Sequence, residues 1–137
     1  MSEEIEEIRR RKLEELRTRE ETGDGSASPT PSEPVPIDGE AELDDVVGEH
    51  GVVLVDFYAD WCGPCRMLEP IVESLAAETD AAVAKVDVDA NQQLATAYGV
   101  RGVPTLVLFS NGEQVEEVVG LEGEAELRAL VESHTAR

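Results

Sequence analysis

The only two cysteines of the chain, Cys62 and Cys65, are separated by two residues and follow directly after Trp61. Two thiols at this spacing beside a strand–helix–strand pattern are typical of redox-active pairs. Exchange with another disulfide needs an accessible thiolate, a second thiol close by, and a group that takes up and returns a proton. The cysteine pair therefore predicts a site for thiol–disulfide exchange.

The two cysteines are expected to have different roles, because a helix is predicted to begin at Cys62 and to run over residues 62–79. Free backbone N–H groups and the positive end of the helix dipole stabilise a thiolate at the start of a helix. Cys62 is therefore predicted to attack. Cys65, nearly one turn further on, is predicted to face the interior and to resolve the mixed disulfide. Pro64 suits a first helical turn, and Gly63 leaves a substrate room to approach.

Two other uses of a cysteine pair fit the sequence less well. A structural zinc ion needs four ligands, and the remaining candidates with nitrogen or sulfur are His50, near a predicted helix end, and His134, near the C-terminus. Covalent haem attachment requires a His directly after the second cysteine, where this chain has Arg66. We therefore expect no metal ion and no cofactor, with the Cys62–Cys65 pair itself as the redox group.

Asp56 is the candidate for proton transfer, because it lies inside the otherwise apolar run of residues 52–58. Burial of an anion is costly, so the pKa of this carboxyl group should be raised, and it could then accept the proton of Cys65 directly or through one water. Lys85 is expected at the matching height of the next parallel strand, where it could pair with Asp56 and tune its pKa. A purely structural Asp at a strand end fits the spacing equally well.

The hydrophobic pattern predicts an α/β fold with a central mixed sheet and helices on both faces. A strand–helix–strand succession over residues 52–88 predicts parallel strands, whereas Asn111-Gly112 predicts an antiparallel hairpin. The predicted strands are residues 35–37, 52–58, 82–88, 105–110 and 114–119, and the predicted helices are residues 40–49, 62–79, 92–98 and 124–133. On the helix after the cysteines, the expected inward residues are Met67, Leu68, Ile71, Val72 and Leu75.

The chain is predicted to have three parts. Residues 1–21 are expected to form a charged amphipathic helix, and residues 22–34, rich in Gly, Ser and Pro, a flexible linker before a domain over residues 35–137. The first helix has an apolar stripe that suits a partner helix or a groove, although a solubilising tail fits the same pattern. The stripe consists of Ile5, Ile8, Leu13 and Leu16.

The composition argues against two classes of partner. With 31 acidic residues against 11 Lys and Arg, the net charge of −20 makes nucleic acid an unfavourable partner. The longest apolar runs are too short to cross a bilayer, and the chain opens without an apolar signal core, so we expect a cytoplasmic protein. The scattered carboxylates favour the solvated acidic surface of a halophilic protein over steering toward basic partners.

Residues 52–131 resemble the thioredoxin family throughout. The similarity is carried by an ordered set of segments, namely residues 55–67 with their Trp-Cys-Gly-Pro-Cys core, Pro70, residues 85–89, 98–105 and 109–112, and Gly120. From the residues alone, the Val103–Pro104 bond is expected to be trans, since only about 5–6% of X–Pro bonds in folded proteins are cis. The resemblance implies a cis bond at Pro104, facing the cysteines.

The resemblance also implies the thioredoxin fold and the roles of the site residues. Cys62 and Cys65 would cycle between dithiol and disulfide while reducing protein disulfides, with Asp56 and Lys85 as a buried proton-handling pair. An extended substrate segment would pair with the backbone before the cis-proline. The implied substrate surface consists of Trp61, Gly63, Pro64, Gly102, Val103, Pro104 and Gly120.

The Gly63-Pro64 dipeptide between the cysteines resembles that of the reducing members of the family, so a reductant is expected. The implied partners are protein disulfides and a thioredoxin reductase as electron donor, and a monomer is expected. Two departures stand out, since Tyr58 occupies a position where many members have Trp and residues 1–34 have no counterpart in minimal members. A rival hypothesis is a binding or assembly module in which the domain is a scaffold and the N-terminal helix docks a partner.

Overall fold

The computed structural model describes residues 29–135. The helix predicted over residues 1–21 lies outside the described residues, and so does most of the predicted linker. The described end of that linker, residues 29–34, contains no helix or strand. Within the described residues, the first strand begins at Val35.

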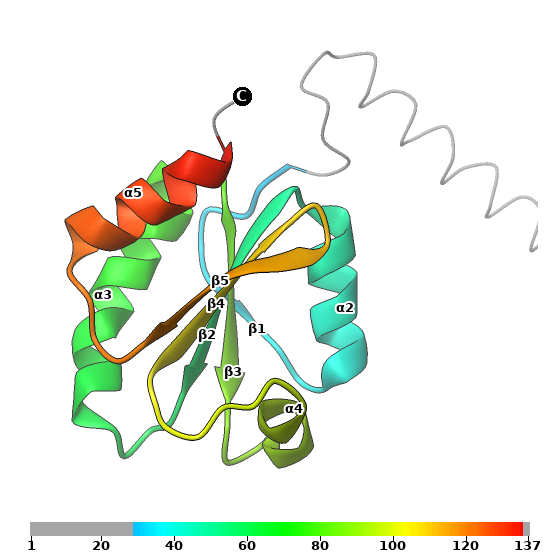
Figure 1. Ribbon diagram of the computed structural model, residues 1–137, viewed down its shortest axis with the longest axis vertical. Coiled ribbons are helices and arrows are strands. Elements are labelled where there is room, and N and C mark those ends of the chain that lie inside the picture. Colours follow the sequence, from blue (N-terminus) through cyan, green and yellow to red (C-terminus); the bar gives the residue numbers. More distant parts are fainter. Residues whose placement is uncertain (1–28, 136–137) are drawn as a thin grey trace, which may run out of the picture.

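A five-stranded mixed sheet forms the centre of the domain (Figure 1). Its order is β1-β3-β2-β4-β5, with β1, β3 and β2 parallel, β4 antiparallel to β2, and β5 antiparallel to β4. The central strand β2 is apolar at nearly every position because both of its faces are buried. The strands are β1 (Val35–Pro36), β2 (Val52–Tyr58), β3 (Ala82–Asp87), β4 (Thr105–Ser110) and β5 (Glu113–Val119).

Helices cover both faces of this sheet, as predicted. The green α3 and the orange-red α5 lie on one face in Figure 1, and the cyan α2 and olive α4 lie on the other. The helices are α2 (Glu40–Glu49), α3 (Gly63–Glu78), α4 (Gln92–Ala97) and α5 (Glu124–Thr135). Within residues 29–135, none of these helices is both long and apolar enough to cross a membrane.

Alternation along the strands divides the core into two layers. On one face, Leu54 of β2 packs with α3 and α5 residues such as Leu68 and Leu127. On the other face, Val55 and Phe57 pack with residues that include Leu43 of α2 and Leu94 of α4. By the same alternation, Asp56 and Lys85 belong to the α3 and α5 face.

The predicted elements agree with the observed ones to within one or two residues at each end. The hairpin prediction is confirmed, because Ser110 of β4 pairs with Glu113 of β5 around a two-residue turn. Asn111 and Gly112 have positive φ values of 53° and 85°, which this kind of tight turn requires at both positions. Asn and Gly are the residues that tolerate such angles best.

One predicted core residue is wrongly placed, since Met67 is 63% exposed. The inward face of α3 is set by Cys65, Leu68 and Val72, which are all buried. At about 100° per residue, Met67 lies roughly 200° around the helix from Cys65 and so points to solvent. The hydrophobic pattern alone did not separate an exposed apolar residue near the site from a core residue.

Candidate active site

The cysteine pair lies where β2 gives way to α3, with Cys62 as the N-cap of the helix. The two cysteines form a disulfide. The backbone N–H of Cys65 donates a hydrogen bond to Cys62 Sγ over 3.1 Å. A donor in this position would stabilise negative charge on Cys62 Sγ in the dithiol state.

Burial does not separate the two cysteines in the way that the sequence predicts. Cys65 faces the interior as expected and is 3% exposed, but Cys62 is only 4% exposed. The cover over Cys62 comes from a loop distant in sequence, since Cys62 Sγ lies 3.7 Å from the carbonyl oxygen of Val103. The asymmetry of the pair therefore resides in hydrogen bonding and in neighbours rather than in exposed area.

The loop before β4 faces Cys62, and its Val103–Pro104 peptide bond is cis. The trans default is therefore wrong for this bond, and the expectation drawn from the family resemblance is confirmed. Thr105 Oγ1 donates to the carbonyl of Gly102 over 2.7 Å, and Gly120 N–H donates to the carbonyl of Pro104 over 2.8 Å. Gly120 has a φ of 99°, a conformation that favours glycine.

Trp61 stands at the rim of the site with 69% of its surface exposed. Its indole Nε1 donates to Asp89 Oδ2 over 2.9 Å, which links the residue before Cys62 to the loop after β3. Exposed Met67 follows on the first turns of α3. Together with exposed Gly63 and Pro64, these side chains give a substrate an open, partly apolar approach to the disulfide.

Asp56 is buried on the α3 and α5 side of β2, with only 1% of its surface exposed. Neither carboxylate oxygen has a hydrogen-bond partner among the described residues. Burial raises the pKa of Asp56 from 3.8 to about 6, the positive charge of Lys85 opposes that rise, and the negative charge of Glu69 adds to it. The raised pKa expected from the apolar strand is thus reproduced, with burial as its main cause.

Lys85 lies level with Asp56 on the neighbouring strand, as the register Asp56↔Lys85 shows. The expected direct pair does not form, because Lys85 Nζ donates instead to Glu69 Oε2 over 3.3 Å. The ammonium group also lies 4.2 Å from the centre of the Tyr58 ring. A long flexible side chain reaches past its strand neighbour to a carboxylate nearer the solvent, where the charge is better hydrated.

A cavity of about 160 Å³ opens beside Cys65. At its edge, the guanidinium of Arg66 donates through Nη2 to the carbonyl of Asp60 over 3.0 Å. The lining residues are Tyr58, Ala59, Asp60, Cys65, Arg66 and Glu69. Waters in a cavity of this size could carry a proton between Cys65 and its surroundings.

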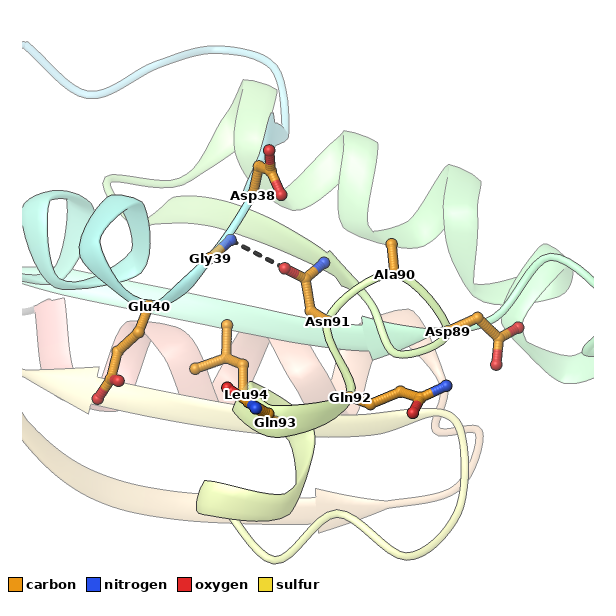
Figure 2. Close-up of a pocket in the computed structure, with 9 residues that line it drawn as sticks. All are labelled: Asp38, Gly39, Glu40, Asp89, Ala90, Asn91, Gln92, Gln93 and Leu94. Atoms are coloured by element: carbon orange, nitrogen blue, oxygen red, sulfur yellow. Dashed lines mark hydrogen bonds between the residues drawn. The ribbon is translucent and has the colours of Figure 1, made fainter.

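A second cavity of about 450 Å³ lies between the loop after β1 and the loop after β3 (Figure 2). Figure 2 shows the hydrogen bond that joins these loops, in which Gly39 N–H donates to Asn91 Oδ1 over 2.8 Å. Asp89, which binds Trp61, lines this cavity as well. The structural tie through Asn91 therefore supports the loop that anchors Trp61.

Sequence reasoning missed three residues of the site, namely Glu69, Asp89 and Asn91. The only signal for Glu69 was its i,i+4 spacing from Cys65, which places the two residues on the same side of α3. No comparable local signal marked Asp89 or Asn91, because their partners are separated from them by 28 and 52 positions in the sequence.

The two histidines considered as zinc ligands lie on other elements. His50 follows the end of α2, and His134 of α5 contacts Glu116 of β5 over 3.2 Å. Over residues 29–135, the structure holds no group of three or more His, Cys, Asp or Glu side chains arranged to bind a metal ion.

Known proteins match this domain closely. The thioredoxin family matches residues 35–133. The chain is 48% identical over 85 residues to the thioredoxin of Chlamydia muridarum, which covers 61% of this chain and 83% of the relative. It is also 48% identical over 85 residues to the thioredoxin of Mycobacterium tuberculosis, covering 61% of this chain and 73% of the relative.

Solved structures extend the likeness. A point mutant of the thioredoxin from Halobacterium salinarum NRC-1 superposes with a TM-score of 0.77 at 67% identity, covering 82% of this chain and 98% of that one. The thioredoxin of Schistosoma mansoni superposes with a TM-score of 0.68 at 33% identity, covering 74% of this chain and 95% of that one.

The cysteine pair and these likenesses together settle the activity. The chain is a protein-disulfide reductase that works through the Cys62–Cys65 dithiol, with protein disulfides as substrates and a reductase as its electron source. From the matched domain, its disulfide and its solved relatives, we conclude that the chain belongs to the thioredoxin family.

Proposed function

We propose that Cys62 is the attacking cysteine of this reductase, that Cys65 resolves the mixed disulfide, and that Asp56 receives the proton of Cys65. The observation that carries the proposal is the position of Cys62 at the N-cap of α3, with the N–H of Cys65 directed at its sulfur over 3.1 Å. The helix dipole and this donor both favour the thiolate of Cys62.

In the first step, the Cys62 thiolate attacks one sulfur of a substrate disulfide. A bond forms between Cys62 Sγ and that sulfur, the substrate S–S bond breaks, and the other substrate sulfur leaves as a thiolate that takes up a proton. The carbonyl of Val103, 3.7 Å from Cys62 Sγ, borders the position of the incoming sulfur.

In the second step, Cys65 gives its proton to the ionised carboxylate of Asp56, directly or through water, and attacks Cys62 Sγ. The Cys62–Cys65 disulfide forms, and the second substrate sulfur leaves as a thiolate. Two electrons pass from the dithiol to the substrate in all. A carboxyl group with a pKa of about 6 is mostly ionised at neutral pH and is a stronger base than an ordinary Asp.

Lys85 belongs to the proton-handling group as a nearby positive charge. Its ammonium lowers the pKa of Asp56 against the effect of burial, although its hydrogen bond goes to Glu69. The charge of Lys85 therefore limits how tightly Asp56 holds its proton and helps it to return to the ionised state between turnovers.

The proposed substrate surface surrounds the disulfide and includes the cis-proline loop. An extended substrate segment would pair with the backbone around Val103, a form of β-strand addition that needs close backbone approach. Gly63 and Gly102 have open space where a side chain would begin, which suits such an approach. The proposed surface consists of Trp61, Gly63, Pro64, Gly102, Val103, Pro104 and Gly120.

Several wider features remain part of this proposal. The electron donor is a thioredoxin reductase, the protein works as a monomer in the cytoplasm, and residues 1–34 are a separate helix and linker attached to the domain over residues 35–137. The net charge of −20 suits a protein that works in concentrated salt, and the 67% identity to a Halobacterium salinarum protein supports that setting.

Reduction of a disulfide-bonded protein by dithiothreitol, with the chain as catalyst, tests the assignment of the cysteines. Cys62→Ser should abolish catalysis, because no attacking thiolate remains. Cys65→Ser should lose turnover but accumulate a mixed disulfide with the substrate, visible on a non-reducing gel. Full activity of Cys62→Ser, or a mixed disulfide formed through Cys65, would show that the roles are reversed or absent.

A further inference from the structure

Glu69 occupies a position on α3 one turn after Cys65, on the rim of the 160 Å³ cavity that opens beside that cysteine. Its Oε2 lies 3.3 Å from Lys85 Nζ, and this hydrogen bond joins α3 to β3. The Glu69 side chain is about half exposed, whereas that of Lys85 is mostly buried. Glu69 is thus a half-exposed carboxylate that binds a mostly buried lysine.

The Lys85 ammonium is held in this place from two sides. Glu69 accepts its hydrogen bond, and the face of the Tyr58 ring lies 4.2 Å beneath it. Both contacts favour a cation. Asp56, although level with Lys85 across two paired strands, keeps both carboxylate oxygens without a partner among the described residues.

We propose that Glu69 is a positioning residue of the redox site, which binds the Lys85 ammonium at the mouth of the cavity and so keeps the Asp56 carboxyl group free of a direct cation partner. This inference rests on the proposed role of Asp56 and names a second carboxylate that controls it. Glu69 touches neither the substrate nor the reacting sulfur atoms; it acts through Lys85.

The groups around Asp56 explain why Glu69 can influence its pKa. The charges that act on Asp56 come from Lys85 of β3 and Glu69 of α3, Tyr58 follows two residues later on its own strand, and β4 places the apolar Leu106 opposite. Lys85 is the cation among them, and the guanidinium of Arg66, which lines the same cavity as Glu69, donates to the carbonyl of Asp60 instead. The carboxylate that binds the Lys85 ammonium therefore adjusts how strongly Asp56 retains a proton, in addition to the larger effect of burial.

The consequence for the reaction concerns the second step. With Lys85 bound to Glu69, the Asp56 carboxylate is a stronger base and accepts the Cys65 proton more readily. Without the Glu69 carboxylate, Lys85 would be free to turn toward Asp56 and stabilise its ionised form. Glu69 also adds its own negative charge to the surroundings of Asp56, which acts in the same direction.

The direct test is a titration of the Asp56 carboxyl carbon by NMR in the full, oxidised chain. Glu69→Gln should lower the pKa of Asp56 by about one pH unit, because a negative charge is lost and a positive one is released. Glu73→Gln is the matched control: it removes the same charge from an exposed position one turn further along α3, and should shift that pKa by less than about 0.2 units. An unchanged or raised pKa in Glu69→Gln would overturn the proposal.

A second pair of variants separates positioning from simple charge repulsion. In a Lys85→Met background, Glu69→Gln should lower the pKa of Asp56 by about half as much as in the wild type, or less, since no ammonium remains to be released. An equal shift in both backgrounds would show that Glu69 does not act through Lys85.

Kinetics keep this inference distinct from the proposed reaction. If Asp56 accepts the Cys65 proton, the pH profile for resolution of the mixed disulfide should move downward in Glu69→Gln along with the pKa. If Asp56→Asn leaves that profile unchanged, the role of Asp56 in catalysis fails, while the NMR titration still decides whether Glu69 positions Lys85.

Discussion

The two faces of β2 are built from the same strand but serve different purposes. On the α2 and α4 face, Val53, Val55 and Phe57 are all apolar and fully buried. On the α3 and α5 face, Val52 and Leu54 are followed by Asp56, buried as completely as its apolar neighbours. The first face is apolar core along its whole length. On the second face, Asp56 interrupts the apolar core near the end of β2 that leads to the cysteines.

This difference shows where the fold trades stability for chemistry. A carboxyl group without hydrogen bonds in the interior costs free energy whenever it is ionised, and nothing in the packing of the sheet requires it. The exception lies near the carboxyl end of β2, the end from which the chain runs on to the cysteines. Substitution of Asp56 should therefore change stability in the opposite direction from substitution of the apolar residues on either face.

The largest expected effect is loss of core packing at Phe57. Phe57→Ala should lower the free energy of unfolding by about 3–5 kcal/mol, and Leu54→Ala on the opposite face by about 2–5 kcal/mol. Denaturant unfolding at a fixed salt concentration measures both. A cost below about 1 kcal/mol at either position would mean that the two layers are not equivalent cores away from the site.

Asp56→Asn should have the opposite sign at neutral pH. The raised pKa means that the folded chain binds this proton more tightly than the unfolded chain, so stability is expected to fall as pH rises from about 4 to about 6 and to stay low above that. A rise of about two pKa units corresponds to about 3 kcal/mol, so the variant should be more stable than the wild type by up to that amount at pH 8.

The same variant should show no gain in stability below pH 4, where the wild-type carboxyl group is protonated in both states. Its turnover should be slowed most near neutral pH, where Asp56 acts as the base. A variant that is equally active at all pH values, or no more stable at pH 8 than the wild type, would make Asp56 an ordinary structural residue like its neighbours on β2.

A smaller effect is expected at Gly120, which joins the end of β5 to the cis-proline loop. Gly120→Ala meets no neighbouring atom but must adopt a φ of 99°, so it should cost about 1–2 kcal/mol of stability. Gly48→Ala within α2 is the matched control and should be stabilising by about 0.5–1 kcal/mol, because alanine favours the helix. Thermal unfolding measures both effects. An equal change in Tm for Gly120→Ala and Gly48→Ala would mean that the backbone at Gly120 is not strained.

The smallest effect is expected from removal of residues 1–28. The described domain carries the cysteine pair, both core layers and the substrate loop, so the truncated chain should reduce small disulfides at the rate of the full chain. A fall of about tenfold or more would favour the rival hypothesis, in which the N-terminal segment is part of the working protein. Activity toward protein substrates, measured in parallel, would show whether the segment recruits partners.

The fold could be predicted from local signals because each was strong by itself. The apolar run of residues 52–58, the Asn111-Gly112 turn and the period of α3 each specify one structure with few competitors. Met67 was misplaced because an apolar side chain near a binding surface leaves the same mark in the pattern as a core residue. The cis bond at Pro104 could not be derived from the residues alone, since local sequence favours trans.

The partner of Lys85 shows a different limit of sequence reasoning. Register fixed its height beside Asp56, and that part was predicted correctly. Whether Lys85 binds Asp56 or Glu69 depends on how far its long side chain reaches and on which carboxylate is better hydrated. Neither property can be predicted from the spacing of residues. The cover over Cys62 likewise comes from Val103, 41 positions away.

The central claim is that the two thiols are chemically unequal, and the pH dependence of their alkylation tests it most directly. The reduced chain would be pulsed with iodoacetamide at a series of pH values, and modification of Cys62 and Cys65 quantified by peptide mass spectrometry. Cys62 should react first, with an apparent pKa below the ordinary thiol value of about 8.5, while Cys65 stays protected at neutral pH. Equal rates at the two cysteines, or faster reaction at Cys65, would contradict the account.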